Sequence, residues 1–210
     1  VKAVLLDPLP YRQAGRLVRI NEHVRGNQFN CSYPNYLDWR QRNRSFEEMA
    51  IYNPAMEMIL EGDQPEAVPA ALTESHLFAM LGHPPALGRT FTALEENGKD
   101  AGVVVLTDKL WRRRFNADPQ VIGRQARFGG FSYTVVGVLP PQFELGPTEV
   151  FLPLKPALNA NMLDRGNHPG FAVIARLKPD ATAESAGQEM RAIGAALERE
   201  RADWSVTRVD

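Results

Sequence analysis

Short runs of alternating or continuous hydrophobic residues recur along the chain and predict a series of short strands. Residues 16–21 alternate and are rich in β-branched side chains, which is typical of a strand. Residues 67–72 show a similar pattern, whereas residues 103–106 are wholly apolar, as expected for a buried strand. Residues 46–60 are apolar and rich in methionine, and this segment fits either a strand or mixed structure.

The second half of the chain contains the clearest turn signal. Two extended runs, 125–128 and 131–138, are separated only by Gly129 and Gly130, which favours a hairpin with a primed turn. The pair Pro140 and Pro141 then ends the second strand. Further strands are predicted at 149–154 and 171–177, with a polar loop between them.

Helices are predicted where capping residues precede residues at helical spacing. Ser32 stands two residues before Pro34, which predicts a helix from there to about Arg42, ending near Asn43. A second helix is predicted over 74–81, ended by Gly82 and the prolines that follow.

Two more helices are expected further along the chain. Thr107 or Asp108 caps a helix that directs Leu110, Trp111 and Phe115 inward. Thr182 begins the clearest predicted helix, an amphipathic pattern in which four apolar side chains share one face. These are Ala186, Met190, Ile193 and Leu197.

These patterns indicate an α+β protein built from short strands and three or four helices. The chain has 210 residues, 44% hydrophobic and 23% charged, which is enough to bury a core in one large domain or two small ones. Its character changes near residue 82 and again near residue 148. We therefore expect one discontinuous lobe from 1–81 and 148–210, and a small mixed α/β lobe inserted at 82–147.

Charge and apolar content exclude some classes of protein. The formal net charge is −1, whereas nucleic-acid binders usually carry a basic excess, and nothing favours adhesion to anionic lipid. No stretch approaches the ~20 apolar residues of a membrane helix, and the start of the chain does not resemble a signal peptide. Because the first residue is Val1, we expect the segment to come from the interior of a longer chain.

The sequence offers no set of residues for catalysis or metal binding. Cys31 is the only cysteine, so it is expected to be a buried or half-buried small residue. His76 and His83 are seven residues apart with Glu74 nearby, but glycine and proline interrupt any helix between them, and surface histidines on a loop are expected. Glu95 and Glu96 fit a helix start or a solvated loop. We predict no catalytic, cofactor-binding or metal-binding residue.

A run of three arginines, Arg112, Arg113 and Arg114, lies between Trp111 and Phe115. In a nucleic-acid interface such arginines would contact phosphates and the aromatic rings would stack on bases. At helical spacing, however, the two aromatic residues share one face, so we expect a buried aromatic pair with the arginines projecting into water.

Several motifs, in order along nearly the whole chain, resemble those of MacB/FtsX-type ABC permeases, in particular the duplicated acidobacterial type. They are Leu5–Tyr11 with Arg16–Arg19, Ser32–Trp39, Arg44–Glu48, Leu81–Phe91, Leu110–Phe115, Asp118–Arg124, Tyr133–Pro141 and Ala175–Pro179 before an amphipathic helix.

The resemblance implies a periplasmic domain inserted between the first and second membrane helices of a permease. Its discontinuous lobe resembles the porter subdomains of efflux pumps. The parent protein is then expected to lie in the inner membrane, to act with a cytoplasmic ABC ATPase subunit or domain, and to be dimeric. The domain is expected to relay ATP-driven motion and to contact a periplasmic adaptor protein. Apolar helices are expected before Val1 and after Asp210.

Two other functions remain open from the sequence. A secreted or periplasmic small-molecule-binding module would need a deep apolar pocket between the lobes. A hydrolase or metal enzyme would need a cluster of perturbed carboxylates or histidines in one cleft.

Overall fold

The computed structural model of the chain describes residues 2–5, 11–24, 27–98 and 102–205. Within these residues, eleven strands form one mixed sheet. The strands are β1 (Lys2–Leu5), β2 (Leu17–Val24), β3 (Asn27–Phe29), β4 (Phe46–Leu60), β5 (Glu66–Thr73), β6 (Leu87–Gly88), β7 (Val103–Leu106), β8 (Gln125–Phe128), β9 (Phe131–Val138), β10 (Val150–Pro153) and β11 (Ala172–Leu177). Six α-helices pack around the sheet: α1 (Tyr33–Arg42), α2 (His76–Leu81), α3 (Ala93–Asn97), α4 (Asp108–Phe115), α5 (Leu154–Ala157) and α6 (Ala183–Ser205).

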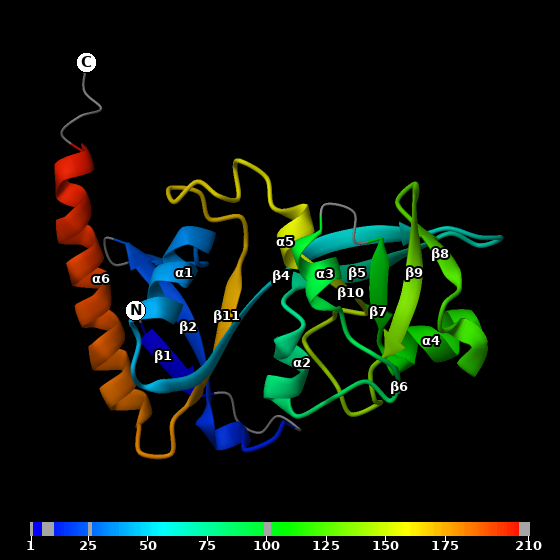
Figure 1. Cartoon of the computed structure of the whole chain (residues 1–210), viewed down its shortest axis with the longest axis horizontal. Helices are drawn as coiled ribbons and strands as arrows, with labels where there is room; N and C mark the ends of the chain where they lie inside the picture. Colours follow the sequence, from blue (N-terminus) through cyan, green and yellow to red (C-terminus); the bar gives the residue numbers. More distant parts are fainter. Residues whose placement is uncertain (1, 6–10, 25–26, 99–101, 206–210) are drawn as a thin grey trace.

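The sheet runs in the order β1-β2-β11-β4-β5-β10-β7-β9-β6, with β3 added to β2 and β8 added to β4 and β9. Figure 1 shows an elongated molecule with two halves. We call them the terminal half (β1, β2, β3, β11, α1 and α6) and the central half (β5 to β10 and α2 to α5). Strand β4 belongs to both, because it pairs with β11 at its beginning and with β5 at its end. The expected α+β class is confirmed, whereas the lobe boundaries at 82 and 147 stay a prediction.

Both faces of the sheet are buried where β4 crosses between the halves. Along β4 the residues alternate: Met49 and Ile51 contribute to one hydrophobic cluster, whereas Ala50 and Tyr52 contribute to the other. Successive side chains of a strand point to opposite faces, so β4 supplies both cores at once. The 46–60 segment, for which the sequence left strand and mixed structure open, is thus one long strand with a register shift between Asn53 and Met56.

The predicted strands and the hairpin turn are confirmed. Strands β7, β8 and β9 have the predicted bounds, and β2, β5, β10 and β11 differ from them by a few residues at their ends. Gly129 and Gly130 both have positive φ, 57° and 88°, as a primed turn requires.

The main helices are also where the sequence placed them. The Ser32 side chain accepts a hydrogen bond from the backbone of Asn35, and Asn43 caps the other end of α1. Thr107 is the N-cap of α4 and accepts from the backbone of Leu110. The apolar stripe of α6 is buried as predicted, and Thr182 accepts from the backbone of Ser185 at its start.

Other elements differ from the expectation. The described residues form six α-helices rather than three or four, because the short α3 and α5 lack enough residues for a periodic pattern. Helix α3 begins with a capping box between Thr92 and Glu95, in agreement with the helix-start role considered for the acidic pair. Residues 27–29 form a short further strand, β3, which pairs with β2. The 5–11 motif lies mostly outside the described residues.

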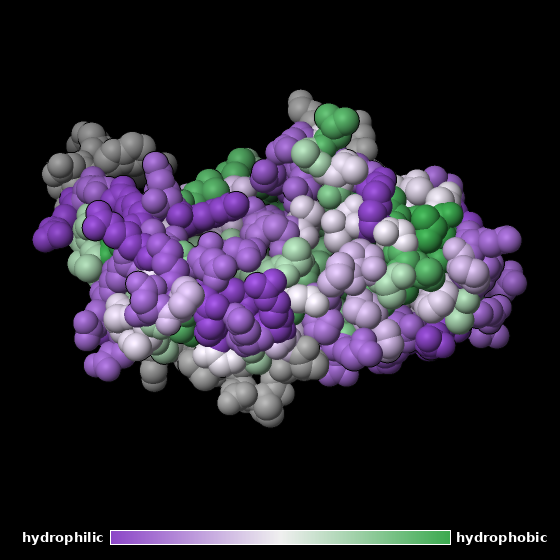
Figure 2. Space-filling model, turned by 60° about the horizontal axis from the view of Figure 1, so that its bottom comes forward, coloured by the Kyte–Doolittle hydropathy of each residue, from purple (hydrophilic) through white to green (hydrophobic). Residues whose placement is uncertain are grey.

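In the described part of the chain, none of the helices combines the length and the apolar composition that crossing a membrane requires. Figure 2 shows one face of the molecule, on which hydrophilic residues predominate and hydrophobic residues gather mainly toward the end of the central half.

Candidate functional site at the two ends of helix α2

Helix α2 lies where the two halves meet (Figure 1). Four of its six residues, Leu77, Phe78, Met80 and Leu81, are buried, and they join an aromatic cluster in which Phe78 meets Phe151 edge-on at 5.4 Å between ring centroids. The helix ends at Gly82, as predicted, but begins at His76, two residues later than predicted. Its apolar side chains therefore fix it in the core, and its two ends carry the polar contacts to the terminal half.

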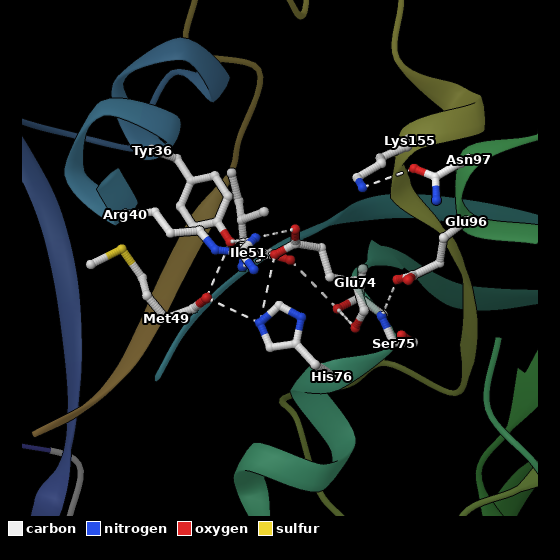
Figure 3. A network of polar contacts seen from close by, with 11 residues as sticks. Tyr36, Arg40, Met49, Ile51, Glu74, Ser75, His76, Glu96, Asn97 and Lys155 are labelled. Carbon is white, nitrogen blue, oxygen red and sulfur yellow. Dashed lines mark hydrogen bonds and ion pairs between the residues drawn. The ribbon is translucent and has the colours of Figure 1, made fainter. Parts of the chain in front are cut away.

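At the N-terminal end of α2, the buried carboxylate of Glu74 accepts hydrogen bonds from residues of α1 and β4 (Figure 3). The hydroxyl group of Tyr36 donates to Oε2, and a guanidinium nitrogen of Arg40 lies 3.0 Å from Oε1. The backbone N–H of Ile51 also donates to Oε2, at 3.4 Å. Both oxygens of Glu74 are thus satisfied, which a buried carboxylate requires.

Burial, together with the charge of Glu74, raises the pKa of Tyr36 well above its ordinary value. The phenol therefore keeps its proton and acts as a donor to the carboxylate. Desolvation disfavours the charge of Arg40, but the interactions with Tyr36 and Glu74 outweigh it and raise the pKa of Arg40. The network thus pairs one buried anion with a neutral donor and a cation.

Further polar contacts continue this network on both sides of Glu74. Nε2 of His76 lies 3.0 Å from the carbonyl oxygen of Met49 and 3.9 Å from Oε2 of Glu74. On the other side, the backbone N–H of Ser75 donates to Glu96 of α3 at 2.5 Å. The start of α2 is thereby connected to α1 and β4 in one direction and to α3 in the other (Figure 3).

A pocket of about 350 Å³ lies beside this end of α2. Its lining is mostly polar or charged: Arg40, Asn43, Phe46, Glu47, Glu48, Met49 and His76. It differs from the deep apolar pocket that a small-molecule-binding module would need.

At the C-terminal end of α2, a buried arginine binds backbone carbonyl groups. Arg176 of β11 is 1% exposed, and its guanidinium group donates to the carbonyl oxygens of Met80 and Arg12, the latter at 2.7 Å. The backbone N–H of Arg12 donates in turn to the carbonyl oxygen of Leu81 at 3.1 Å. Carbonyls of the last helical turn lack partners within the helix and carry partial negative charge, so a cation suits this position.

Desolvation, and to a smaller extent the neighbouring charges of Arg12 and Arg16, lower the pKa of Arg176. An arginine remains protonated after such a shift, because its ordinary pKa is so high. The carbonyl groups therefore meet a permanent charge.

The histidines and the cysteine considered in the sequence occupy separate places. His76 begins α2 and does not lie on a loop, which corrects that expectation, whereas the His83 ring contacts those of Tyr11 and Phe143 at 5.8 and 6.0 Å. Cys31 is buried as expected, and burial raises the pKa of its thiol well above the ordinary value. Among the described residues, no group of three or more His, Cys, Asp or Glu side chains is arranged to hold a metal ion.

The arginine run of α4 differs from the expectation. Trp111 and Phe115 are half-buried rather than buried, and Arg112 lies over the ring of Trp111 at 5.4 Å. The prediction that all three arginines project into water is wrong for Arg114, whose side chain is 19% exposed, whereas Arg113 is exposed as expected but is also engaged by acidic side chains. The guanidinium groups of Arg113 and Arg114 form ion pairs with Glu66, the first residue of β5, and that of Arg113 also pairs with Glu149, which directly precedes β10.

Sequence reasoning considered Glu74 only as a neighbour of two histidines and missed its role at the junction. The available signal was a lone carboxylate between a strand and a helix, which does not reveal partners 38 residues away in α1. Nor does the sequence of β11 indicate that Arg176 reaches α2, 96 residues away.

Comparison with known proteins gives concordant results. The chain matches the family described as MacB-like periplasmic core domain over residues 4–193. None of the curated proteins compared with the chain matches it in sequence.

Three solved structures share the fold. A domain of a putative permease protein from Porphyromonas gingivalis is 20% identical, with a TM-score of 0.69 over 91% of this chain and 86% of that chain. The periplasmic region of MacB from Actinobacillus actinomycetemcomitans is 15% identical, with a TM-score of 0.67 over 92% of this chain and 93% of that one. The extracellular domain of the noncanonic ABC-type transporter YknZ from Gram-positive bacteria is also 15% identical, with a TM-score of 0.60 over 80% and 84%.

Proposed function

Because the chain belongs to the family of MacB-like periplasmic core domains, we propose that it relays ATP-driven motion as the extracytoplasmic part of an ABC-type permease. The observation that carries this proposal is the family match over residues 4–193, which includes nearly every element of the sheet. The fold shared with the periplasmic region of MacB and the extracellular domain of YknZ supports the same placement outside the cytoplasm.

The construction of the domain suits a mechanical role. One sheet extends through both halves, and both faces of β4 are buried where it crosses between them. A force applied to the terminal half is therefore transmitted through strand pairing and core packing to the central half, because packed interiors have low compressibility. This arrangement supports relay of motion by a domain that performs no chemistry itself.

The proposal includes the partners of the domain. An ABC ATPase subunit or domain of the parent transporter supplies the motion, the parent acts as a dimer, and a periplasmic adaptor protein contacts the domain. It also includes two lobes divided at residues 82 and 147. None of these steps needs a catalytic, cofactor-binding or metal-binding residue in this chain.

The first experiment is to read the coding DNA on both sides of the segment. We expect hydrophobic stretches of ~20 residues on each side and an ATPase gene or domain nearby. A reading frame with a cleavable signal and a stop codon close to Asp210 would overturn the permease assignment.

The relay itself is tested in the parent complex. A spin label at position 94, introduced by Leu94→Cys, lies on α3, where the native side chain is 86% exposed. We expect the distance between the labels of the two copies to change when a nonhydrolysable ATP analogue binds to the ATPase. An unchanged distance in a dimer that binds the analogue would contradict the relay, and a single label per complex would contradict the dimer.

A further inference from the structure

We propose that the two halves swing about the C-terminal end of α2, and that the Glu74 contacts at its N-terminal end are the part of the junction that opens. The motion is a property of the domain itself, although its use in transport rests on the proposed function. Three features carry the proposal: the half-exposed Arg40 at one end of α2 against the buried Arg176 at the other, the pocket beside Arg40, and a break in β4.

The N-terminal contacts can open because water can replace them. The side chain of Arg40 is 49% exposed and lines the 350 Å³ pocket together with His76. When Glu74 moves away from Tyr36 and Arg40, the pocket admits water to the carboxylate and the guanidinium group. Because water solvates the carboxylate and the guanidinium group as they part, this separation costs less than leaving the same groups unpaired in a dry core.

The C-terminal contacts cannot open in the same way. Arg176 is 1% exposed, and one of its acceptors, the carbonyl oxygen of Met80, belongs to the last turn of α2 and has no partner within the helix. Separating them would leave a buried cation and the buried carbonyl group of Met80 unsatisfied, which costs far more than opening a hydrated pair. The end of α2 near Arg176 therefore stays in place and serves as the pivot.

The regular pairing of β4 is interrupted at the place where such a swing requires the strand to bend. Its pairing with β11 ends at Tyr52, and its register with β5 shifts between Asn53 and Met56. Pro54 stands within this interval and has no backbone N–H to donate. The side chain of Asn53 accepts a hydrogen bond from the backbone N–H of Ala55 and donates one to the carbonyl oxygen of Pro169, both at 3.0 Å. Bulged strands bend more readily than regular ones, so β4 is the hinge strand of the swing.

The test measures the distance between the halves in the isolated domain. Spin labels are placed at exposed positions of α3 and α6 with Leu94→Cys and Ala195→Cys, in a Cys31→Ala background. We expect a narrow distance distribution for the parent form, meaning the labelled domain without any further substitution. Arg40→Gln and Glu74→Gln should each broaden this distribution or add a second, distinct distance.

The matched control is Arg42→Gln. Arg42 also lies on α1 and forms an ion pair, at 2.7 Å to Glu200 of α6, but this pair is outside the junction. The control should keep the narrow distribution. If Arg40→Gln, Glu74→Gln and Arg42→Gln all give the same distribution as the parent form, the opening at Glu74 is wrong.

A second variant tests the pivot. Arg176→Met is expected to lower the midpoint of thermal unfolding while the distance distribution of the folded fraction stays narrow. A folded Arg176→Met domain with a distribution as broad as that of Arg40→Gln would overturn the assignment of the pivot. These outcomes do not depend on a membrane or an ATPase, so they are distinguishable from a failure of the proposed relay.

Discussion

The hydroxyl group of Tyr36 in α1 donates a hydrogen bond to the carboxylate of Glu74 at the start of α2. Both residues are buried, with 0% and 4% of their surface exposed. This contact joins the two halves of the molecule, because α1 belongs to the terminal half, where its Asn35 donates to Glu22 of β2, whereas Glu74 directly follows β5 in the central half. A charge buried at such a position demands fixed partners, so the residues around it specify how the halves meet.

Removal of this hydroxyl group tests its contribution to stability. Tyr36→Phe leaves the ring in place but deprives the buried carboxylate of one donor, so we expect the free energy of unfolding to fall by about 1–3 kcal/mol. Urea denaturation followed by circular dichroism measures the change.

The control for Tyr36→Phe is Tyr33→Phe. Tyr33 is another buried tyrosine of α1, and the structure gives its hydroxyl group no hydrogen bond within the described residues. Its substitution should change stability by less than about 0.5 kcal/mol. Equal effects of the two substitutions would mean that the Tyr36 hydroxyl contributes nothing specific.

The other end of α2 gives a second prediction. Arg176→Met keeps much of the side-chain volume but leaves the carbonyl groups of Met80 and Arg12 without their charged donor. We expect a loss of about 1.5–3 kcal/mol in the free energy of unfolding. The exposed Arg191→Met on α6 is the control and should lie within about 0.5 kcal/mol of the parent form. A loss below 0.5 kcal/mol for Arg176→Met would show that water reaches these carbonyls.

Local features of this fold are readable from the sequence, whereas contacts between distant segments are not. Ser32 and Thr107 indicate helix starts because a capping side chain acts within three residues, and Gly129-Gly130 indicates its turn because both residues take positive φ. The short α3 and α5 give no periodic signal. The partners of Glu74 depend on how α1 packs against β4, which follows from the whole core.

The arginine run of α4 illustrates the same limit. Helical spacing places Trp111 and Phe115 on the side of α4 that packs against the core, but it does not indicate what lies beside the polar side chains. In the structure, β5 and β10 are neighbours in the sheet, and they bring Glu66 and Glu149 to Arg113. A residue expected to be solvated is thereby engaged by two carboxylates that are distant in sequence.

A substitution at Gly88 is expected to destabilise the domain strongly, because the backbones of β6 and β9 approach each other closely there. This residue has φ +68°, and a Cβ atom there would lie 2.2 Å from the carbonyl oxygen of Val136. Gly88→Ala should therefore force β6 away from β9 and destabilise the domain by about 2–3 kcal/mol. Gly123 also has positive φ, +87°, but open space surrounds it, so Gly123→Ala should cost only about 1 kcal/mol. Thermal unfolding distinguishes the two, and equal costs would show that the backbone of β6 shifts freely.

The capping box of α3 predicts a dependence of stability on pH. The Glu95 carboxylate accepts two hydrogen bonds from Arg89 and one from the backbone N–H of Thr92. The bonds to Arg89 are the largest cause that lowers the pKa of Glu95 from 4.5 to about 2. A carboxyl group whose pKa is lower in the folded state stabilises the fold above its unfolded pKa, and this contribution is lost as the pH falls through its folded pKa.

Glu95→Gln removes that contribution. We expect the variant to be less stable than the parent form by about 0.5–2 kcal/mol at pH 7, which is the range for loss of a helix cap. The difference should shrink as the pH falls from 4.5 toward 2, because the parent carboxylate then becomes protonated as well. Urea unfolding of both forms at pH 7, 4 and 2.5 measures this convergence.

Glu184→Gln, which changes an exposed carboxylate in the first turn of α6, is the control. A difference between Glu95→Gln and the parent form that stays constant over this range would mean that the charge of Glu95 does not stabilise the start of α3.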